Sequence, residues 1–193
     1  MKKTLLFLML FLASFTLFSC NKAKQRQKDN SKANTLVGYA LKDVYAKDIP
    51  EDSLDIVINL DSLKAQGYDA IPLSDKDFAL SKALLHAKFN AERKSIEAKK
   101  DEFNPTPLPF REYFRQYWAY KKRGHTYVHI ELAAECPVSY KTPNPDKTTL
   151  MTLVLKGLRD SELCVDDGGI YFGSALIDLT MKKVIYLRFN GVA

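Results

Sequence analysis

The spacing of apolar residues changes after Gly124, and this change constrains the fold more than any other feature of the sequence. Before it, two segments repeat their apolar residues with the helical period of about 3.6 residues. After it, apolar and polar residues alternate, as in strands with one buried face. The alternating segments are HTYVHIELAAEC, TLMTLVLK, ELCV, IYFGSALIDL and KVIYLRFN. Helices followed by a run of strands predict the α+β class.

The first predicted helix begins at Ser74, where Asp77 three residues later completes a capping-box pattern. Its first half is apolar almost all round, which predicts burial and makes His86 a core histidine. Its second half keeps only a thin apolar stripe through Ile96 and Phe103. The prolines of NPTPLP end the helix, because proline cannot continue it.

The second predicted helix is FREYFRQYWAYKKRG, residues 110–124. Its aromatic residues lie at i, i+3, i+4, i+7 and i+8, which places them on one helical face. Gly124 suits a C-terminal cap. The interleaved arginines also resemble a platform on which bases or sugars stack, but the helical spacing favours a core role.

These segments predict a single α+β domain over residues 35–193, in which two helices precede an antiparallel meander of four to six strands. Two further strands are expected upstream, in LVGYALKDVY and DIVINL. We expect the sheet to curve around the first helix, similar in outline to cystatin-like or NTF2-like folds.

The N-terminal segment has the parts of a secretory signal. Lys2 and Lys3 precede sixteen uncharged residues, whereas a membrane span needs about 20 apolar residues. The residues LFSC, ending at Cys20, resemble the lipobox of bacterial lipoproteins. This resemblance implies that residues 1–19 are removed as a signal peptide and that Cys20 is the lipid anchor, with a diacylglycerol on its sulfur and a further chain such as palmitate on its amine. The alternatives are an uncleaved anchor or a plain signal with a coincidental cysteine.

Residues 20–34 contain no large apolar residue and predict a flexible basic tether. Its bases either attract anionic headgroups or simply keep a linker solvated. Surface-exported lipoproteins of the Bacteroidota tend to have acids directly after the cysteine, and this chain has bases there. The resemblance therefore implies attachment on the periplasmic side, which we interpret as the outer membrane.

The net charge of +6 invites a nucleic-acid-binding interpretation, but the excess lies outside the domain. Of the 29 basic and 23 acidic residues, the signal contains two bases, and the tether contains five bases and one acid. The domain keeps 22 of each and is neutral. Because a nucleic-acid-binding domain has a basic surface, no nucleic-acid partner is predicted.

Cys136 and Cys164 remain after Cys20 is assigned to the anchor. An even number of cysteines in an oxidising compartment is compatible with a disulfide between them. The alternative is two buried thiols, because free cysteine is a common core residue.

The segment HTYVHIE contains the candidate pocket residues Tyr127, His129 and Glu131. On a strand these side chains and His125 share one face, with successive members about 7 Å apart. A His–Glu pair with a tyrosine could do acid–base chemistry, and the alternative is a solvated outer face. The two histidines lie about 13 Å apart on a strand, too far to share a metal, so no metal site or cofactor is predicted.

Other motifs indicate structure rather than chemistry. VDDGG, residues 165–169, is typical of a hairpin turn and lacks the alternating acids of a calcium loop. Neither a nucleophile elbow nor a phosphate-binding loop occurs, so no catalytic residues are predicted. The chain resembles small Bacteroidota lipoproteins of unknown function in four segments: YFRQYWAY, the strand with Cys136, VDDGG and FNGVA.

The sequence therefore predicts a lipid-anchored cell-envelope protein that binds a partner without catalysis. Its expected partners are the membrane, through the acylated Cys20, and an envelope protein. The alternative is small-molecule binding or hydrolysis in a pocket between the sheet and the helices.

Overall fold

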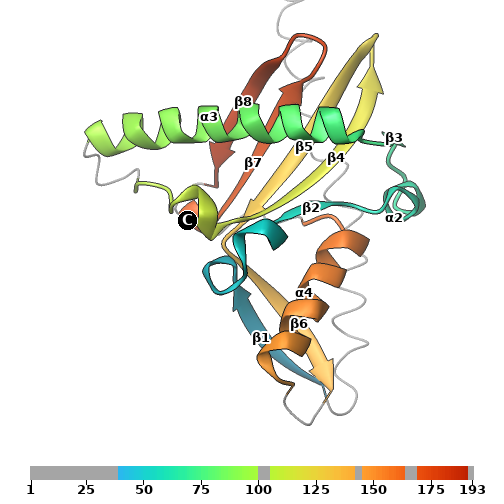
Figure 1. The fold of residues 1–193 in the computed structure, drawn as a ribbon, viewed down its shortest axis with the longest axis vertical. Coiled ribbons are helices and arrows are strands. Elements are labelled where there is room, and N and C mark those ends of the chain that lie inside the picture. The colour runs from blue at the N-terminus through green and yellow to red at the C-terminus, as the bar shows by residue number, and fades with distance from the viewer. Residues whose placement is uncertain (1–38, 100–104, 142–144, 164–168, 191–193) are drawn as a thin grey trace, which may run out of the picture. The chain divides into compact units, whose positions relative to one another are not determined.

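The computed structural model describes residues 39–99, 105–141, 145–163 and 169–190. The chain divides into two units, residues 1–40 and 41–193, and the elements below belong to the second apart from the first residues of β1. The described residues confirm the α+β class, with a mixed main sheet of six strands and a separate two-stranded sheet (Figure 1).

The main sheet has the strand order β2–β4–β5–β7–β8, with β3 also pairing with β4. Its strands are β2 (Asp55–Val57), β3 (Ala70–Ile71), β4 (Phe114–Lys122), β5 (His125–Ala133), β7 (Phe172–Asp178) and β8 (Lys183–Phe189). The predicted antiparallel pairing of the strands after Gly124 is confirmed for β5, β7 and β8. β4 pairs antiparallel with β5, and β2, which lies in the expected upstream strand DIVINL, runs parallel to β4.

The smaller sheet pairs β1 (Tyr39–Tyr45) with β6 (Glu135–Lys141), and α4 (Lys147–Asp160) packs against β6. Leu150, Val154 and Leu158 form the buried face of α4. They share a core with Ala46 of the 3-10 turn η1 (Ala46–Asp48) and with Ile56 of strand β2. Three further 3-10 turns are η2 (Glu51–Ser53), η3 (Phe110–Glu112) and η4 (Gly169–Tyr171).

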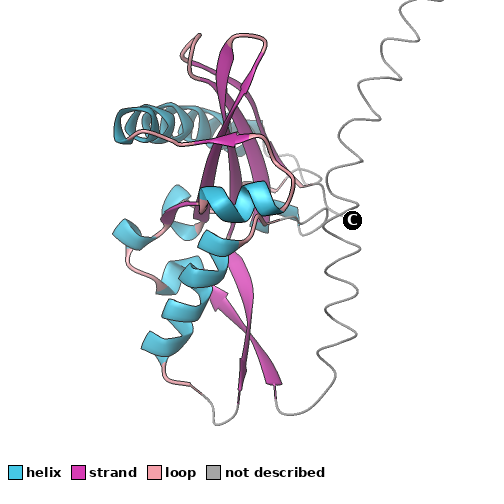
Figure 2. Cartoon of the chain, turned by 90° about the vertical axis from the view of Figure 1, so that its right-hand side faces the viewer, coloured by secondary structure: helices cyan, strands magenta, loops and turns pink. Residues whose placement is uncertain are grey.

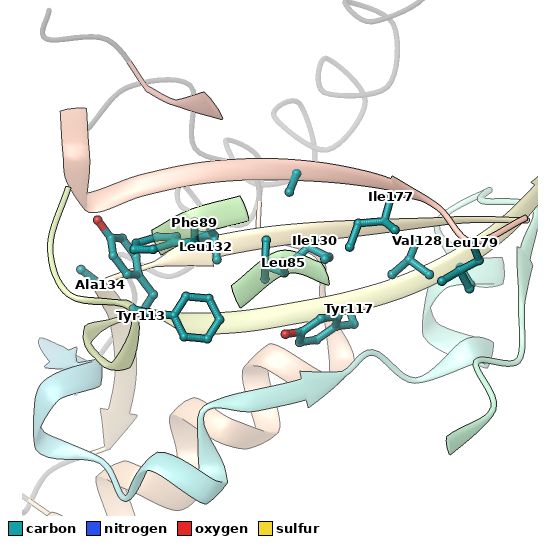
Figure 3. Close-up of a cluster of buried hydrophobic side chains, with 13 residues drawn as sticks. Leu85, Phe89, Tyr113, Tyr117, Val128, Ile130, Leu132, Ala134, Ile177 and Leu179 are labelled. Carbon is teal, nitrogen blue, oxygen red and sulfur yellow. The ribbon is translucent and has the colours of Figure 1, made fainter. Parts of the chain in front are cut away.

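Helix α3 (Asp75–Lys99) lies across one face of the main sheet, as Figures 1 and 2 show. Ser74 is confirmed as its cap, because the Asp77 amide donates to Ser74 Oγ over 3.1 Å, and the Ser74 hydroxyl donates in turn to the Asp77 carboxylate over 2.8 Å. Leu85 and Phe89 bury one face of α3 against apolar side chains of β4, β5 and β7 (Figure 3).

The prediction that the first half of α3 is buried all round is wrong. The helix buries a stripe only, and His86 is exposed, packing edge-on against Phe110 at a ring separation of 4.9 Å. A helix lying on a sheet has one covered face, so its apolar residues on the other side stay in contact with water.

The predicted helix over residues 110–124 is wrong, because this segment forms the turn η3 and strand β4. Residues Phe114 to Ala119 are all buried. A central strand covered on both faces reads as a continuous apolar run rather than an alternating one. Arg123 and Gly124 have φ values of 52° and 81° and form a two-residue hairpin turn, which pairs β4 with β5.

The predicted strand TLMTLVLK is also wrong, because it lies in α4. Asp146 caps this helix by accepting a hydrogen bond of 2.7 Å from the Thr149 amide. Leu150, Val154 and Leu158 recur at the i+4 spacing of a helix face. Glu162 and Leu163, in the predicted strand ELCV, lie outside any regular element.

Several predictions concern residues outside the described ranges. These are the signal peptide, Cys20 and the tether to residue 34, Phe103, Cys164 with its candidate disulfide to Cys136, and residues 165–168 of the VDDGG turn. Cys136 itself is buried. Among the described residues, no helix combines the length and apolar character that crossing a membrane requires.

Candidate functional site

The main sheet has a second face, opposite α3, which we call the polar face. Alternate residues of each strand point to opposite sides of a sheet, and the residues that contact α3 include Tyr117, Val128 and Ile130. Their neighbours along the strands therefore point away from α3. The polar face includes Gln116, Trp118 and Tyr120 of β4, Tyr127, His129 and Glu131 of β5, Ser174 and Leu176 of β7, and Tyr186 and Arg188 of β8.

Short α2 (Leu60–Ala65) and the residues after it cover one part of the polar face. Asn59 caps α2 by accepting a hydrogen bond of 2.9 Å from the Asp61 amide. Leu63 then packs against Trp118, whose ring also lies 4.9 Å from the Tyr68 ring. This packing fixes the Trp118 indole beside β5.

His129 lies between Trp118 and Glu131. Its Nε2 atom is 2.5 Å from Glu131 Oε1, and its ring stacks on Trp118, its cross-strand neighbour, at 5.2 Å. Both charged side chains are half-buried, with 20% of each exposed. Burial opposes protonation of His129, but the hydrogen bond and the charge of Glu131 outweigh it and raise the pKa of the imidazole.

Glu162 approaches the same place from the segment that follows α4. The Trp118 Nε1–H donates to Glu162 Oε1 over 3.1 Å, and the Tyr68 hydroxyl donates to Oε2. Burial raises the pKa of this carboxyl, although the hydrogen bond from Tyr68 acts in the opposite direction. Both of its hydrogen-bond donors are neutral, so they orient the carboxylate without balancing its charge.

Gln116 holds the segment that contains Glu162. The buried Gln116 side chain donates to the carbonyl oxygens of Leu158 and Ser161 over 2.5 Å and 2.6 Å. Its own oxygen accepts a hydrogen bond of 2.8 Å from the Leu163 amide. Because all three bonds are made to backbone groups flanking Glu162, strand β4 positions this residue directly.

His129, Glu131 and Glu162 form what we call the His–Glu–Glu cluster. One ligating atom from each side chain lies within 4.8 Å of those of the other two. Among the described residues, neither glutamate forms an ion pair with a lysine or arginine, and His129 is the only basic partner of Glu131. Two carboxylates therefore share one histidine.

The sequence-predicted pocket residues are brought together only in part. His129 and Glu131 interact, and both are half-buried rather than fully solvated. Tyr127 stacks instead on Tyr120 at 5.4 Å and on His125 at 6.0 Å. His125 has a separate partner, since its Nδ1 atom lies 2.6 Å from Asp178 Oδ2.

Sequence reasoning missed Glu162, Tyr68, Trp118 and Gln116 as members of this site. Trp118 and Gln116 were assigned to a helix, and the strand assignment would have placed them opposite His129 and Glu131. Tyr68 and Glu162 are separated by 94 residues, and no local pattern indicates that they meet.

The face toward α3 contains a different charged cluster, centred on Asp55. Arg115 Nε lies 2.5 Å from Asp55 Oδ1, and Lys82 Nζ lies 2.5 Å from Oδ2. The Tyr117 hydroxyl also donates to Oδ1 over 3.0 Å. Burial of Asp55 opposes ionisation, but the hydrogen bonds from Arg115 and Lys82 prevail and lower the pKa of this carboxyl.

Comparisons with known protein families, with curated proteins and with solved structures found no match for this chain.

Proposed function

We propose that this chain is a lipid-anchored protein on the periplasmic side of the outer membrane, and that it binds a cation at the His–Glu–Glu cluster without catalysing a reaction. The lipobox ending at Cys20 supports the anchor. The crossing of α3 over the antiparallel part of the main sheet supports a cystatin-like or NTF2-like outline.

The observation that supports cation binding is the imbalance of charge on the polar face. Glu131 and Glu162 lie close to each other beside His129, and Arg188 of the same face is near enough to oppose protonation of His129 but forms no ion pair with either glutamate among the described residues. Half-buried carboxylates in one place repel each other unless a positive charge joins them. A bound cation would supply that charge.

The same geometry favours binding over nucleophilic catalysis. A serine or cysteine nucleophile is activated by a hydrogen bond to its base. Within the described ranges, the hydrogen bond of the His129 ring goes to Glu131, and none joins the ring to a serine or cysteine side chain.

Trp118 allows binding to be measured directly, because it is the single tryptophan of the chain and donates to Glu162. Full-length lipidated protein in detergent micelles would be titrated with Zn²⁺, Mg²⁺ and spermidine while tryptophan fluorescence is recorded. We expect a saturable change with at least one probe, and loss of that change in the double variant Glu131→Gln, Glu162→Gln. The double variant Glu92→Gln, Glu97→Gln on α3 is the matched control. An unchanged tryptophan fluorescence of the wild-type protein with all three probes would contradict the proposed function.

The anchor is tested separately in cells. We expect labelled palmitate to be incorporated into the wild-type chain and not into Cys20→Ser. Equal labelling of the two proteins would reject Cys20 as the anchor.

A further inference from the structure

The His–Glu–Glu cluster has the donor set of a transition-metal site. We propose that it binds a divalent ion such as Zn²⁺, with His129, Glu131 and Glu162 as the protein ligands. This inference rests on the proposed cation-binding function and names the class of cation.

The donor atoms select the class of metal. Carboxylate oxygens alone suit Mg²⁺ and Ca²⁺, whereas an imidazole nitrogen suits zinc, copper, iron and nickel. One imidazole with two carboxylates is a combination that zinc accepts, and three protein ligands leave a further position for water. An organic cation would need no imidazole, so His129 is the residue that separates the two classes.

The separations between donor atoms are close to those that a metal requires. Ligands about 2.1 Å from a tetrahedral zinc ion lie roughly 3.4 Å from one another. The three donor atoms of the cluster lie within 4.8 Å of each other, and His129 Nε2 is 2.5 Å from Glu131 Oε1. Entry of the ion therefore requires the His129–Glu131 hydrogen bond to open by about 1 Å, a movement available to two side chains that are each 20% exposed.

Neighbouring side chains hold the ligands in the way that metal sites need. Trp118 stacks on the His129 ring and donates to Glu162, and Tyr68 donates to the other Glu162 oxygen. Such outer contacts orient ligands and typically change metal affinity by about 10–100-fold when removed. Because the donors here are neutral, they orient Glu162 and leave its charge for the metal.

The backbone arrangement adds a further element of rigidity. His129 and Glu131 project from the same face of β5, a central strand paired on both sides. Gln116 fixes the segment containing Glu162 to β4 through three hydrogen bonds. All three proposed ligands are thus supported by the main sheet.

The test is a Zn²⁺ titration of the full-length lipidated protein in detergent micelles, followed by Trp118 fluorescence and by isothermal calorimetry. We expect stoichiometric, saturable binding of one Zn²⁺. His129→Gln and Glu162→Gln should each weaken it by about 100-fold or more, beyond the range of outer contacts. His86→Gln on the exposed side of α3 and Glu97→Gln are the matched controls, and they should leave binding unchanged.

X-ray absorption of the zinc-loaded wild-type protein gives a second readout that needs no variant. It should show one imidazole and otherwise oxygen ligands. A shell with no imidazole, or equal Zn²⁺ affinity in His129→Gln and His86→Gln, would overturn the assignment of these ligands.

Failure of the metal inference is distinguishable from failure of the proposed function. Binding of spermidine or Mg²⁺ with no binding of Zn²⁺ would overturn the transition-metal inference and leave cation binding in place. Lack of response to every probe would overturn both.

Discussion

Each face of the main sheet holds a cluster of charged residues, and the two clusters differ in how their charges are matched. Toward α3, the carboxylate of Asp55 is 5% exposed and meets Arg115, Lys82 and the Tyr117 hydroxyl. On the polar face, the carboxylates of Glu131 and Glu162 share His129.

The difference separates a structural role from a binding role. The buried Asp55 carboxylate has its charge balanced by two cationic partners, and its removal harms the fold because it leaves a buried arginine unpaired. The half-buried carboxylates of Glu131 and Glu162 have hydrogen-bond partners, but only His129 among those partners can balance their negative charge. Substitution in the first cluster should therefore affect stability, and substitution in the second should affect ligand binding.

The largest expected effect is that of Asp55→Ala. This change leaves Arg115, which is 1% exposed, without its carboxylate. We expect the free energy of unfolding to fall by about 3–5 kcal/mol, as measured by urea denaturation followed by circular dichroism. Lys82→Ala is the control, because this partner is 47% exposed and a surface pair contributes only about 0–1 kcal/mol. Equal losses in the two variants would refute the distinction between buried and exposed partners.

Gln116→Ala should have an intermediate effect on both properties. It removes three hydrogen bonds to backbone groups around Glu162. We expect a stability loss of roughly 1–3 kcal/mol, measured by urea denaturation, together with Zn²⁺ binding weakened by about 10–100-fold. Gln66→Ala, at an exposed position after α2, should change stability by less than about 0.5 kcal/mol. Loss of stability with unchanged Zn²⁺ affinity would show that Gln116 does not position Glu162.

Acidification should lower the free energy of unfolding by protonating Asp55. The loss should be smaller than that caused by Asp55→Ala. Its folded-state pKa is lowered, so its contribution to stability is complete above the unfolded-state value of about 4 and is lost as the pH falls through the folded-state value. Urea denaturation of the wild-type protein, repeated in steps of about half a pH unit from about pH 6 to about pH 3, should show a declining free energy of unfolding. A decline of the same size in Asp55→Asn would assign the acid sensitivity to other groups.

The smallest expected effect on stability is that of Glu162→Gln. Burial raises the pKa of Glu162, so its ionised form is less favourable in the folded state than in the unfolded state at neutral pH. We expect the neutral isostere to change the free energy of unfolding by no more than about 0.5 kcal/mol, or to raise it, in urea denaturation without added metal. A loss as large as that of Asp55→Ala would make the two clusters equivalent and remove the basis of the comparison.

Local rules predicted some elements well. The Ser74 cap of α3 depends on neighbouring residues only, and so do the alternating patterns that predicted β5, β7 and β8. His129 and Glu131 were placed on one face of a strand for the same reason, because a strand alternates regardless of its surroundings.

The remaining elements depend on contacts between segments that are distant in the sequence. β4 is covered on both faces, which erases the alternation by which a strand is recognised. The apolar run of α4 has the same ambiguity, because short buried runs do not distinguish a helix from a strand. The third member of the cluster, Glu162, and its partner Tyr68 come from segments 94 residues apart. Local sequence patterns were enough to predict the class of fold and the faces of its alternating strands, and they carry the lipobox resemblance at Cys20. The meeting of His129, Glu131 and Glu162 required the folded chain, because a contact between distant segments depends on how every element between them packs.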